Sequence, residues 1–182
     1  MKRTRLVFSG SGGQGVITAA IILAEAAVIH EGMNATQSQT YGAAARGGST
    51  RSDVILSDSE IHFPEVTQPN ILVCLTQEAY TSFSPIVRPG GLLLTDSRFV
   101  TTFKKVDAKQ IELPVYETVM AQIGKPIVFN ISVLGALIGI TELINPASIM
   151  EVVKTRVPKD FVEMNSRALE LGLAMGSQHK FK

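Results

Sequence analysis

The chain has 182 residues, of which 45% are hydrophobic and 18% charged, a globular composition that excludes a disordered chain. Its 17 basic and 16 acidic residues leave a formal net charge of +1, which argues against nucleic acid or a membrane surface as the main partner. The length suits a single domain over residues 1–182. With one cysteine, Cys74, these residues alone can form neither an intrachain disulfide nor a cysteine-ligated iron–sulfur cluster or zinc site.

No segment is predicted to cross or enter a membrane. The apolar stretch over residues 16–29 contains Glu25 and falls short of the ~20 residues that span a bilayer. The apolar run after the basic N-terminus ends at Phe8, too early for the core of a signal peptide. We therefore expect a cytoplasmic protein.

The N-terminal part of the chain is predicted to alternate strands with one long helix. Residues 5–9 form an apolar strand, and the apolar segment after it predicts a helix over 13–30. Residues 34–40 predict a polar second strand. Residues 49–57 alternate in polarity, which predicts a half-exposed strand that is antiparallel or at an edge, and 61–63 predict a short returning strand.

The rest of the chain adds three strands and most of the helices. Residues 70–75 are the most apolar strand, as in the centre of a parallel sheet, and a helix over 77–83 leads to a buried strand at 92–95. A strand at 110–115 is followed by helices at 116–123, 130–143, 146–156 and 159–175. Together these elements predict an α/β fold: a doubly wound, mostly parallel Rossmann-like sheet with helices on both faces, an antiparallel edge and a helical C-terminal third.

Two of the predicted helices, 13–30 and 130–143, are apolar on nearly every face. A helix that is apolar all round is expected to be covered on all sides, which favours a partner subunit over part of this surface. The alternative is a sheet with helices packed on both of its faces, which would bury both helices within the chain.

A glycine-rich corner joins the first strand to the first helix. Its residues are Gly10, Ser11, Gly12, Gly13, Gln14 and Gly15. Glycines allow a tight turn and close approach of a ligand, and the N–H groups at a helix start favour anions. The G-x-G-x-x-G spacing is present, but no carboxylate occurs from Asn34 to Gly48 to bind a ribose. The corner therefore favours a phosphate-bearing ligand other than NAD, with tight strand–helix packing as the alternative.

A second candidate loop follows the predicted second strand. It contains Gln39, Tyr41, Arg46, Gly47 and Gly48. An arginine flanked by glycines can offer its guanidinium group to a phosphate or carboxylate. In a doubly wound sheet this loop lies at the same carboxyl edge as the glycine corner, so the two are expected to face one crevice; a solvated surface turn is the alternative.

Catalytic groups are scarce in the sequence. His30, His62 and His179 lie far apart and lack metal-ligand spacing. Asn130 is predicted to cap a helix, and Asp96 to act in a cap or turn. We therefore expect no catalytic residue and no metal ligand on this chain, and a stand-alone enzyme is not favoured.

Two motifs in order resemble a known family. The first is the stretch Phe8 to Val16 with the helix segment after it; the second is Gln39 to Gly48, followed by Ser57 to Ile61. Over roughly residues 5–171 the chain resembles the gamma subunit of 2-oxoacid:ferredoxin (acceptor) oxidoreductases. The short Tyr-Gly…Arg-Gly-Gly loop is most similar to the 2-oxoglutarate (KorC/OorC-like) branch.

The resemblance implies a subunit of a complex that oxidatively decarboxylates a 2-oxoacid to an acyl-CoA and reduces ferredoxin. Thiamine diphosphate and Mg would be held by alpha and beta subunits, and iron–sulfur clusters by partners that include a ferredoxin-like delta subunit. This chain would contribute to coenzyme A binding through the glycine corner and Arg46, would be inactive alone, and could self-associate when isolated. The alternatives are a subunit of a pyruvate or indolepyruvate oxidoreductase, or a free-standing nucleotide-binding module.

Overall fold

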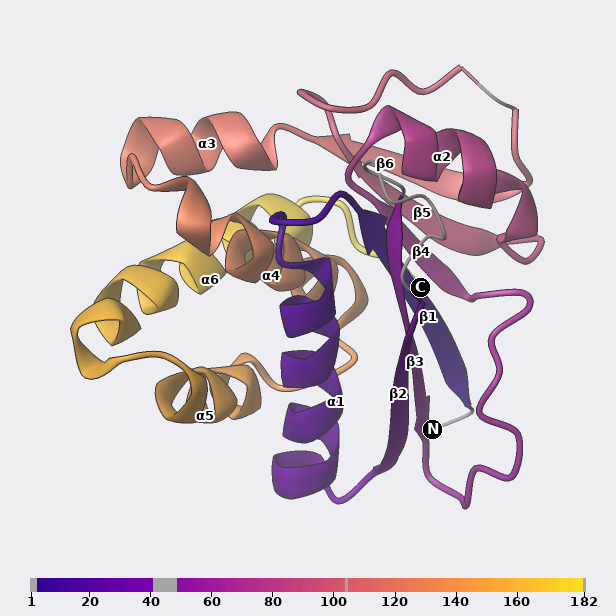
Figure 1. Cartoon of the computed structure of the whole chain (residues 1–182), viewed down its shortest axis with the longest axis horizontal. Helices are drawn as coiled ribbons and strands as arrows, with labels where there is room; N and C mark the ends of the chain where they lie inside the picture. Colours follow the sequence, from indigo (N-terminus) through magenta and orange to yellow (C-terminus); the bar gives the residue numbers. More distant parts are fainter. Residues whose placement is uncertain (1–2, 41–48, 104, 182) are drawn as a thin grey trace.

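The computed structural model describes residues 3–40, 49–103 and 105–181 as an α/β fold (Figure 1). In chain order its elements are β1 (Thr4–Gly10), α1 (Val16–Glu31), β2 (Asn34–Thr40), β3 (Thr50–Ser57), β4 (Ile71–Cys74), α2 (Gln77–Phe83), η1 (Ser84–Ile86), β5 (Gly91–Asp96), β6 (Ala108–Leu113), α3 (Val115–Gln122), η2 (Pro126–Val128), α4 (Phe129–Thr141), α5 (Pro146–Arg156), η3 (Lys159–Phe161) and α6 (Val162–Ser177). The predicted α/β class and the helical C-terminal third are confirmed.

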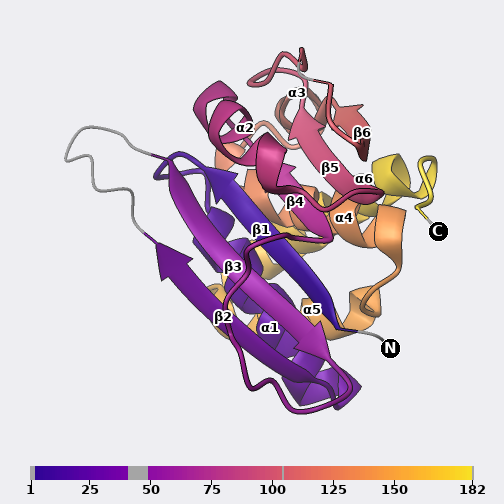
Figure 2. The same ribbon diagram turned by 90° about the vertical axis from the view of Figure 1, so that its right-hand side faces the viewer.

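The strands form one six-stranded sheet in the order β2-β3-β1-β4-β5-β6. β1, β4, β5 and β6 are parallel, whereas β3 is antiparallel to both β1 and β2. The mostly parallel sheet and its antiparallel part at one side are therefore as predicted. The antiparallel strand itself lies second from the edge, because β2 returns to pair with its outer side (Figure 2). With neighbours on both sides, β3 is buried from Val54 to Ser57 and is not the half-exposed strand expected.

Helices cover both faces of the sheet. One hydrophobic cluster joins the sheet to α1, α3, α4, α5 and α6, and a second, smaller cluster joins the opposite face to α2. In Figure 1 the larger helical layer lies to the left of β1, β2 and β3, and α2 is at the upper right, over β5 and β6. The doubly wound arrangement places the first β–α junction at the carboxyl edge of the sheet, where the glycine corner was predicted.

The two apolar helices are buried mainly by this chain. α4 packs against α6, α3 and α1, and every residue from Ile131 to Ile140 is buried. α1 lies between the sheet and α5, and it buries residues from Val16 to Ala27 on most of its circumference. Helices on both faces of a sheet, the alternative given above, thus account for the apolar surface of α4 and for most of that of α1. Val28 and Ile29 near the end of α1 stay exposed.

α4 and α6 cross at unusually short range because glycines line the contact. A Cβ atom on Gly172 would lie 2.0 Å from the carbonyl oxygen of Ser132, and one on Gly176 would lie 2.1 Å from that of Ala136. Gly135 and Gly139 on α4 meet the backbone of α6 in the same way. Ser132 also donates a hydrogen bond through Oγ to the Ala168 carbonyl, at 2.8 Å. The close crossing is what encloses α4.

Three local predictions were wrong. Residues 61–63 form no strand, since β3 has no free edge beside it for a returning strand. The final helix begins at Val162, after a 3-10 turn over Lys159–Phe161, and not at residue 159. Asn130 lies inside α4 rather than capping it.

Candidate functional site

The glycine corner has the strand–turn–helix geometry predicted for it. β1 ends at Gly10, and α1 begins at Val16 with Gly15 as its N-cap. Gly13 and Gly15 adopt left-handed φ angles of 91° and 72°, a conformation that other residues rarely tolerate. These two glycines therefore let the chain reverse from the sheet into the helix.

The carboxamide of Gln14 fills the inside of the corner. Its Oε1 accepts a hydrogen bond from the Ser11 N–H at 2.8 Å, and its Nε2 donates to the Leu75 carbonyl at 2.9 Å. Gln14 thus ties the β1–α1 turn to the end of β4. The Ser11 N–H therefore already has an acceptor in Gln14 and is not free to donate to an anion bound in this corner.

The glycines of the G-x-G-x-x-G spacing have different roles. A Cβ on Gly10 would lie 2.5 Å from Oε1 of Gln14, and one on Gly15 would lie 2.6 Å from Nδ2 of Asn130. Both positions therefore make room for the chain's own side chains. Gly12 and Gly13 are exposed, and a Cβ on either would meet nothing within 4 Å. The surface open to a ligand is the outer side of Gly12 and Gly13.

The described ends of the two predicted loops lie at the same edge of the sheet. Gly10 pairs with Thr50 at the start of β3, and Thr40 at the end of β2 pairs with Arg51 on the other side of that strand. Gln39 lies one residue before this end, opposite Ser52. Tyr41, Arg46, Gly47 and Gly48 lie outside the described residues, so their part in the site stays a prediction.

A cavity of about 410 Å³ lies beside the corner, on the helical side of the sheet. Its walls come from the corner and α1, from η2 and the start of α4, and from the connection between α5 and α6. The lining residues are Gly13, Gln14, Gly15, Thr18, Ile22, Pro126, Ile127, Val128, Asn130, Ile131, Arg156, Val157, Pro158, Phe161 and Asn165. No sequence spacing indicates this cavity, because its walls lie more than a hundred residues apart in the chain.

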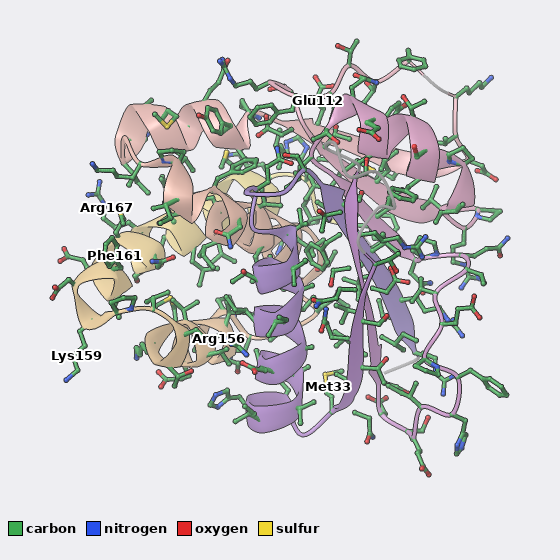
Figure 3. The ribbon with its side chains drawn as sticks, in the orientation of Figure 1. Met33, Glu112, Arg156, Lys159, Phe161 and Arg167 are labelled. Carbon is green, nitrogen blue, oxygen red and sulfur yellow. The ribbon has the colours of Figure 1, made fainter. Side chains whose placement is uncertain are left out.

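An ion pair borders the cavity between α1 and α5. Arg156 donates through Nε to Oε2 of Glu25 at 2.6 Å, with a second contact from Nη2 to Oε1. This hydrogen bond, more than the charge, lowers the pKa of Glu25 from its usual value. Figure 3 shows Arg156 between the two helices and Phe161 at the neighbouring start of α6. The Arg156 guanidinium group thus lines the cavity while it is paired with the Glu25 carboxylate.

A second hollow lies on the opposite face, beneath the ends of β2 and β3. Its central group is Arg51, which pairs with Asp53 at 2.6 Å and donates to the Val66 carbonyl at 2.6 Å. The Arg51 guanidinium also lies over the Phe83 ring, 5.4 Å from its centroid. Because these contacts hold Arg51 on three sides, we interpret it as a support for the start of β3.

The remaining titratable candidates have structural roles. Asp96 accepts hydrogen bonds from the backbone N–H groups of Arg98 at 2.9 Å, in the turn after β5, and of Tyr116 at 2.8 Å, in the first turn of α3, as expected for its predicted cap or turn role. Burial raises the pKa of Asp96 despite these bonds. Cys74 is fully buried, and burial raises the pKa of its thiol to about 12. His30, His62 and His179 are exposed and separate.

Within residues 3–40, 49–103 and 105–181, no three His, Cys, Asp or Glu side chains are grouped so that they could hold a metal ion. In the same ranges no helix combines the length and apolar character of a membrane span. The chemistry available at the corner is thus backbone N–H groups, amides and an adjoining cavity.

Comparison with known proteins gives the family. Residues 5–175 match the family "Pyruvate ferredoxin/flavodoxin oxidoreductase". The chain belongs to this family. A curated relative, 2-oxoglutarate synthase subunit KorC of Methanocaldococcus jannaschii, is 38% identical over 97% of this chain and 95% of its own length.

Solved structures of the same fold extend the comparison. The gamma subunit of a keto/oxoacid ferredoxin oxidoreductase from Geobacter sulfurreducens is 38% identical, covers 100% of both chains and has a TM-score of 0.90. 2-Oxoglutarate:ferredoxin oxidoreductase from Magnetococcus marinus is 20% identical with a TM-score of 0.88, which shows the fold; this chain covers 32% of that longer one. Relatives named pyruvate synthase subunit PorC are less similar, at 29% identity.

Proposed function

We propose that this chain is the gamma subunit of a 2-oxoglutarate:ferredoxin oxidoreductase. The complex would convert 2-oxoglutarate and coenzyme A to succinyl-CoA and CO₂, and pass the two electrons released to ferredoxin or a similar acceptor. The observation that supports this best is the near full-length similarity, at 34–38% identity, to four subunits named for 2-oxoglutarate synthase.

The catalytic cofactors belong, in this proposal, to other chains. Alpha and beta subunits would hold thiamine diphosphate and Mg, and a ferredoxin-like delta subunit would carry iron–sulfur clusters, in a cytoplasmic assembly. The buried, protonated Cys74 is unsuited to ligate a cluster, and the described acidic side chains form no group suited to Mg. The contribution of this chain would be to bind coenzyme A and to complete the assembly.

The glycine corner is the proposed contact for the coenzyme A phosphates. The open outer side of Gly12 and Gly13, at the start of a 16-residue helix, offers backbone N–H groups and the positive end of the helix dipole. Arg46, on the loop after β2, would supply the matching cation. The cavity beside the corner has apolar walls and the amides of Asn130 and Asn165, which suit the uncharged arm of the same molecule.

Two substitutions in the assembled complex test this site. Arg46→Ala should raise the KM for coenzyme A about tenfold or more, since a charge-assisted contact contributes ~1.5–3 kcal/mol, and should leave the KM for the oxoacid unchanged. Thr18→Phe, which places a ring at the cavity wall, should act in the same direction. Arg167→Ala, at an exposed position of α6, is the control.

Purification of the complex from its native source tests the assignment itself. We expect thiamine-enzyme subunits to co-elute with this chain and the complex to reduce ferredoxin with 2-oxoglutarate. A stable monomer without such partners would contradict the subunit role. An unchanged KM for coenzyme A in both variants would instead show that the glycine corner does not contact coenzyme A, and would leave the subunit role intact.

A further inference from the structure

The outer edge of the sheet carries an interaction surface that the proposed function does not use. β2 is the outermost strand, and among the described residues no strand pairs with its outer side (Figure 2). Its residues pair one to one with β3 from Asn34–Ser57 to Thr40–Arg51, without a bulge. Asn34 to Ser38 therefore present a flat strand edge whose outward N–H and C=O groups can receive another strand.

β2 lacks charge, proline and bulges, three of the features that usually keep such an edge from pairing. Natural edge strands are protected by charged side chains, proline, bulges or a covering loop. The β2 sequence, Asn-Ala-Thr-Gln-Ser-Gln-Thr, contains no charge and no proline, and its register is regular. It is also long for an edge strand, at seven residues. These properties fit a strand that pairs with a partner.

An aliphatic flank of α1 borders the same edge. Ile17 and Ile21 are half-buried and Val28 is 47% exposed; a helical repeat of 3.6 residues puts the three on one side. The flank that carries Ala19 and Ala26 is at most 2% exposed and lies on the side of α4. The half-exposed flank thus looks outward over β2, as the front of the helix does in Figure 1.

We propose that this surface, the β2 edge together with the Ile17–Ile21–Val28 flank of α1, binds a second copy of the chain. Antiparallel pairing of β2 with β2 of the other copy, about a two-fold axis perpendicular to the sheet, gives one continuous sheet. The same axis places the two α1 helices on one face of it, flank to flank. One operation therefore satisfies both parts of the surface.

The spacing of the elements agrees with this arrangement. α1 packs across both β2 and β3, so its axis lies over the boundary between them. With strands about 4.8 Å apart, the two α1 axes would be separated by roughly 10 Å, which is the distance at which helices pack through aliphatic side chains. The charge of Glu25 at the border of the flank is paired with Arg156, and Glu31 at the end of α1 accepts hydrogen bonds from the Asn145 N–H and the Ser148 hydroxyl.

The proposal concerns the isolated chain and stands without the proposed function. Sedimentation equilibrium should show a monomer–dimer equilibrium for the wild type. Thr36→Lys on the strand and Ile21→Asp on the helix flank should each weaken dimerisation at least tenfold, because like charges would face each other across the axis. Ala121→Lys, on exposed α3, should not. Circular dichroism and thermal unfolding confirm that each variant is folded.

A cysteine scan identifies the pairing directly. Single cysteines at positions 35 to 38 are oxidised in turn, while Cys74 stays protected by burial. In a two-fold antiparallel pair, each step away from the axis separates the two copies of a residue by about 6–7 Å more, beyond the reach of a disulfide. Cross-linking should therefore peak at one position or two neighbouring ones. A wild-type chain that stays monomeric, a dimer that survives Thr36→Lys or Ile21→Asp, or equal or absent cross-linking at all four positions would overturn the proposal.

Discussion

Gln14 holds the glycine corner in its conformation through hydrogen bonds within the chain itself. Both ends of its carboxamide are bonded within the chain, at 2.8 Å to Ser11 and 2.9 Å to Leu75. Gly10 lacks a side chain because Gln14 occupies that space, and Gly15 because Asn130 does. Part of the G-x-G-x-x-G spacing therefore serves the packing of the chain's own side chains. Only Gly12 and Gly13 leave space that a ligand could occupy.

Replacement of Gln14 by alanine should lower the free energy of unfolding. The Ser11 N–H and the Leu75 carbonyl both lose their partner, at a cost of about 1–3 kcal/mol in a partly buried site. Denaturant unfolding measures the change, with Gln122→Ala on exposed α3 as the control. Hydrogen exchange should also show faster exchange of the Ser11 amide. Equal stability of the two variants would mean that the corner does not depend on this clamp.

At the scale of elements, the α4–α6 crossing explains how a small domain can enclose an entirely apolar helix. Four glycines, two on each helix, bring the backbones together, so that α6 covers α4 across a wide contact. The remaining sides of α4 are covered by α1 and α3. The helix that looked from its composition as if it needed a partner chain has its partners inside the fold.

Gly172→Ala tests this crossing through the sign of the change in the free energy of unfolding. In an exposed helix, glycine to alanine stabilises by about 0.5–1 kcal/mol. Here the new Cβ would lie 2.0 Å from the Ser132 carbonyl oxygen, so the helices must separate and the protein should lose at least 1–3 kcal/mol. Thermal unfolding compares it with Glu170→Ala, an exposed site two residues away. A variant as stable as the wild type would show that the helices can separate without cost.

At the scale of the whole molecule, the near balance of charge is the property that matters for assembly. A formal net charge of +1 produces little long-range repulsion between copies. The proposed edge surface has no charged residue on β2. Association through it should therefore depend on backbone hydrogen bonds and aliphatic contact.

The dimer dissociation constant should accordingly change less than about threefold between low and high salt, where charge-driven association weakens strongly. Sedimentation equilibrium at several ionic strengths measures it. A steep loss of the dimer on adding salt would indicate that charged groups elsewhere hold the copies together.

Periodicity and turn residues were sufficient to predict most of the fold, including the corner between β1 and α1 and the polar strand β2. They could not predict that β3 lies between β2 and β1, because the alternation of polar and apolar residues indicates how each face of a strand is buried and not which strands are its neighbours. They also missed the cavity, whose walls at Thr18, Asn130 and Asn165 meet only through tertiary packing. The role of Gln14 was equally hidden, since its partner Leu75 lies 61 residues away.

The position of β3 has a consequence for how the two loops can vary. Because β3 lies between β2 and β1, the chain passes from β2 to an antiparallel neighbour of that strand. The ends of the segment between these two strands are fixed by the Thr40–Arg51 pair, while the corner is fixed separately by Gly10–Thr50 and Gln14. Residues can therefore be added to or removed from the Arg46 segment without moving the corner.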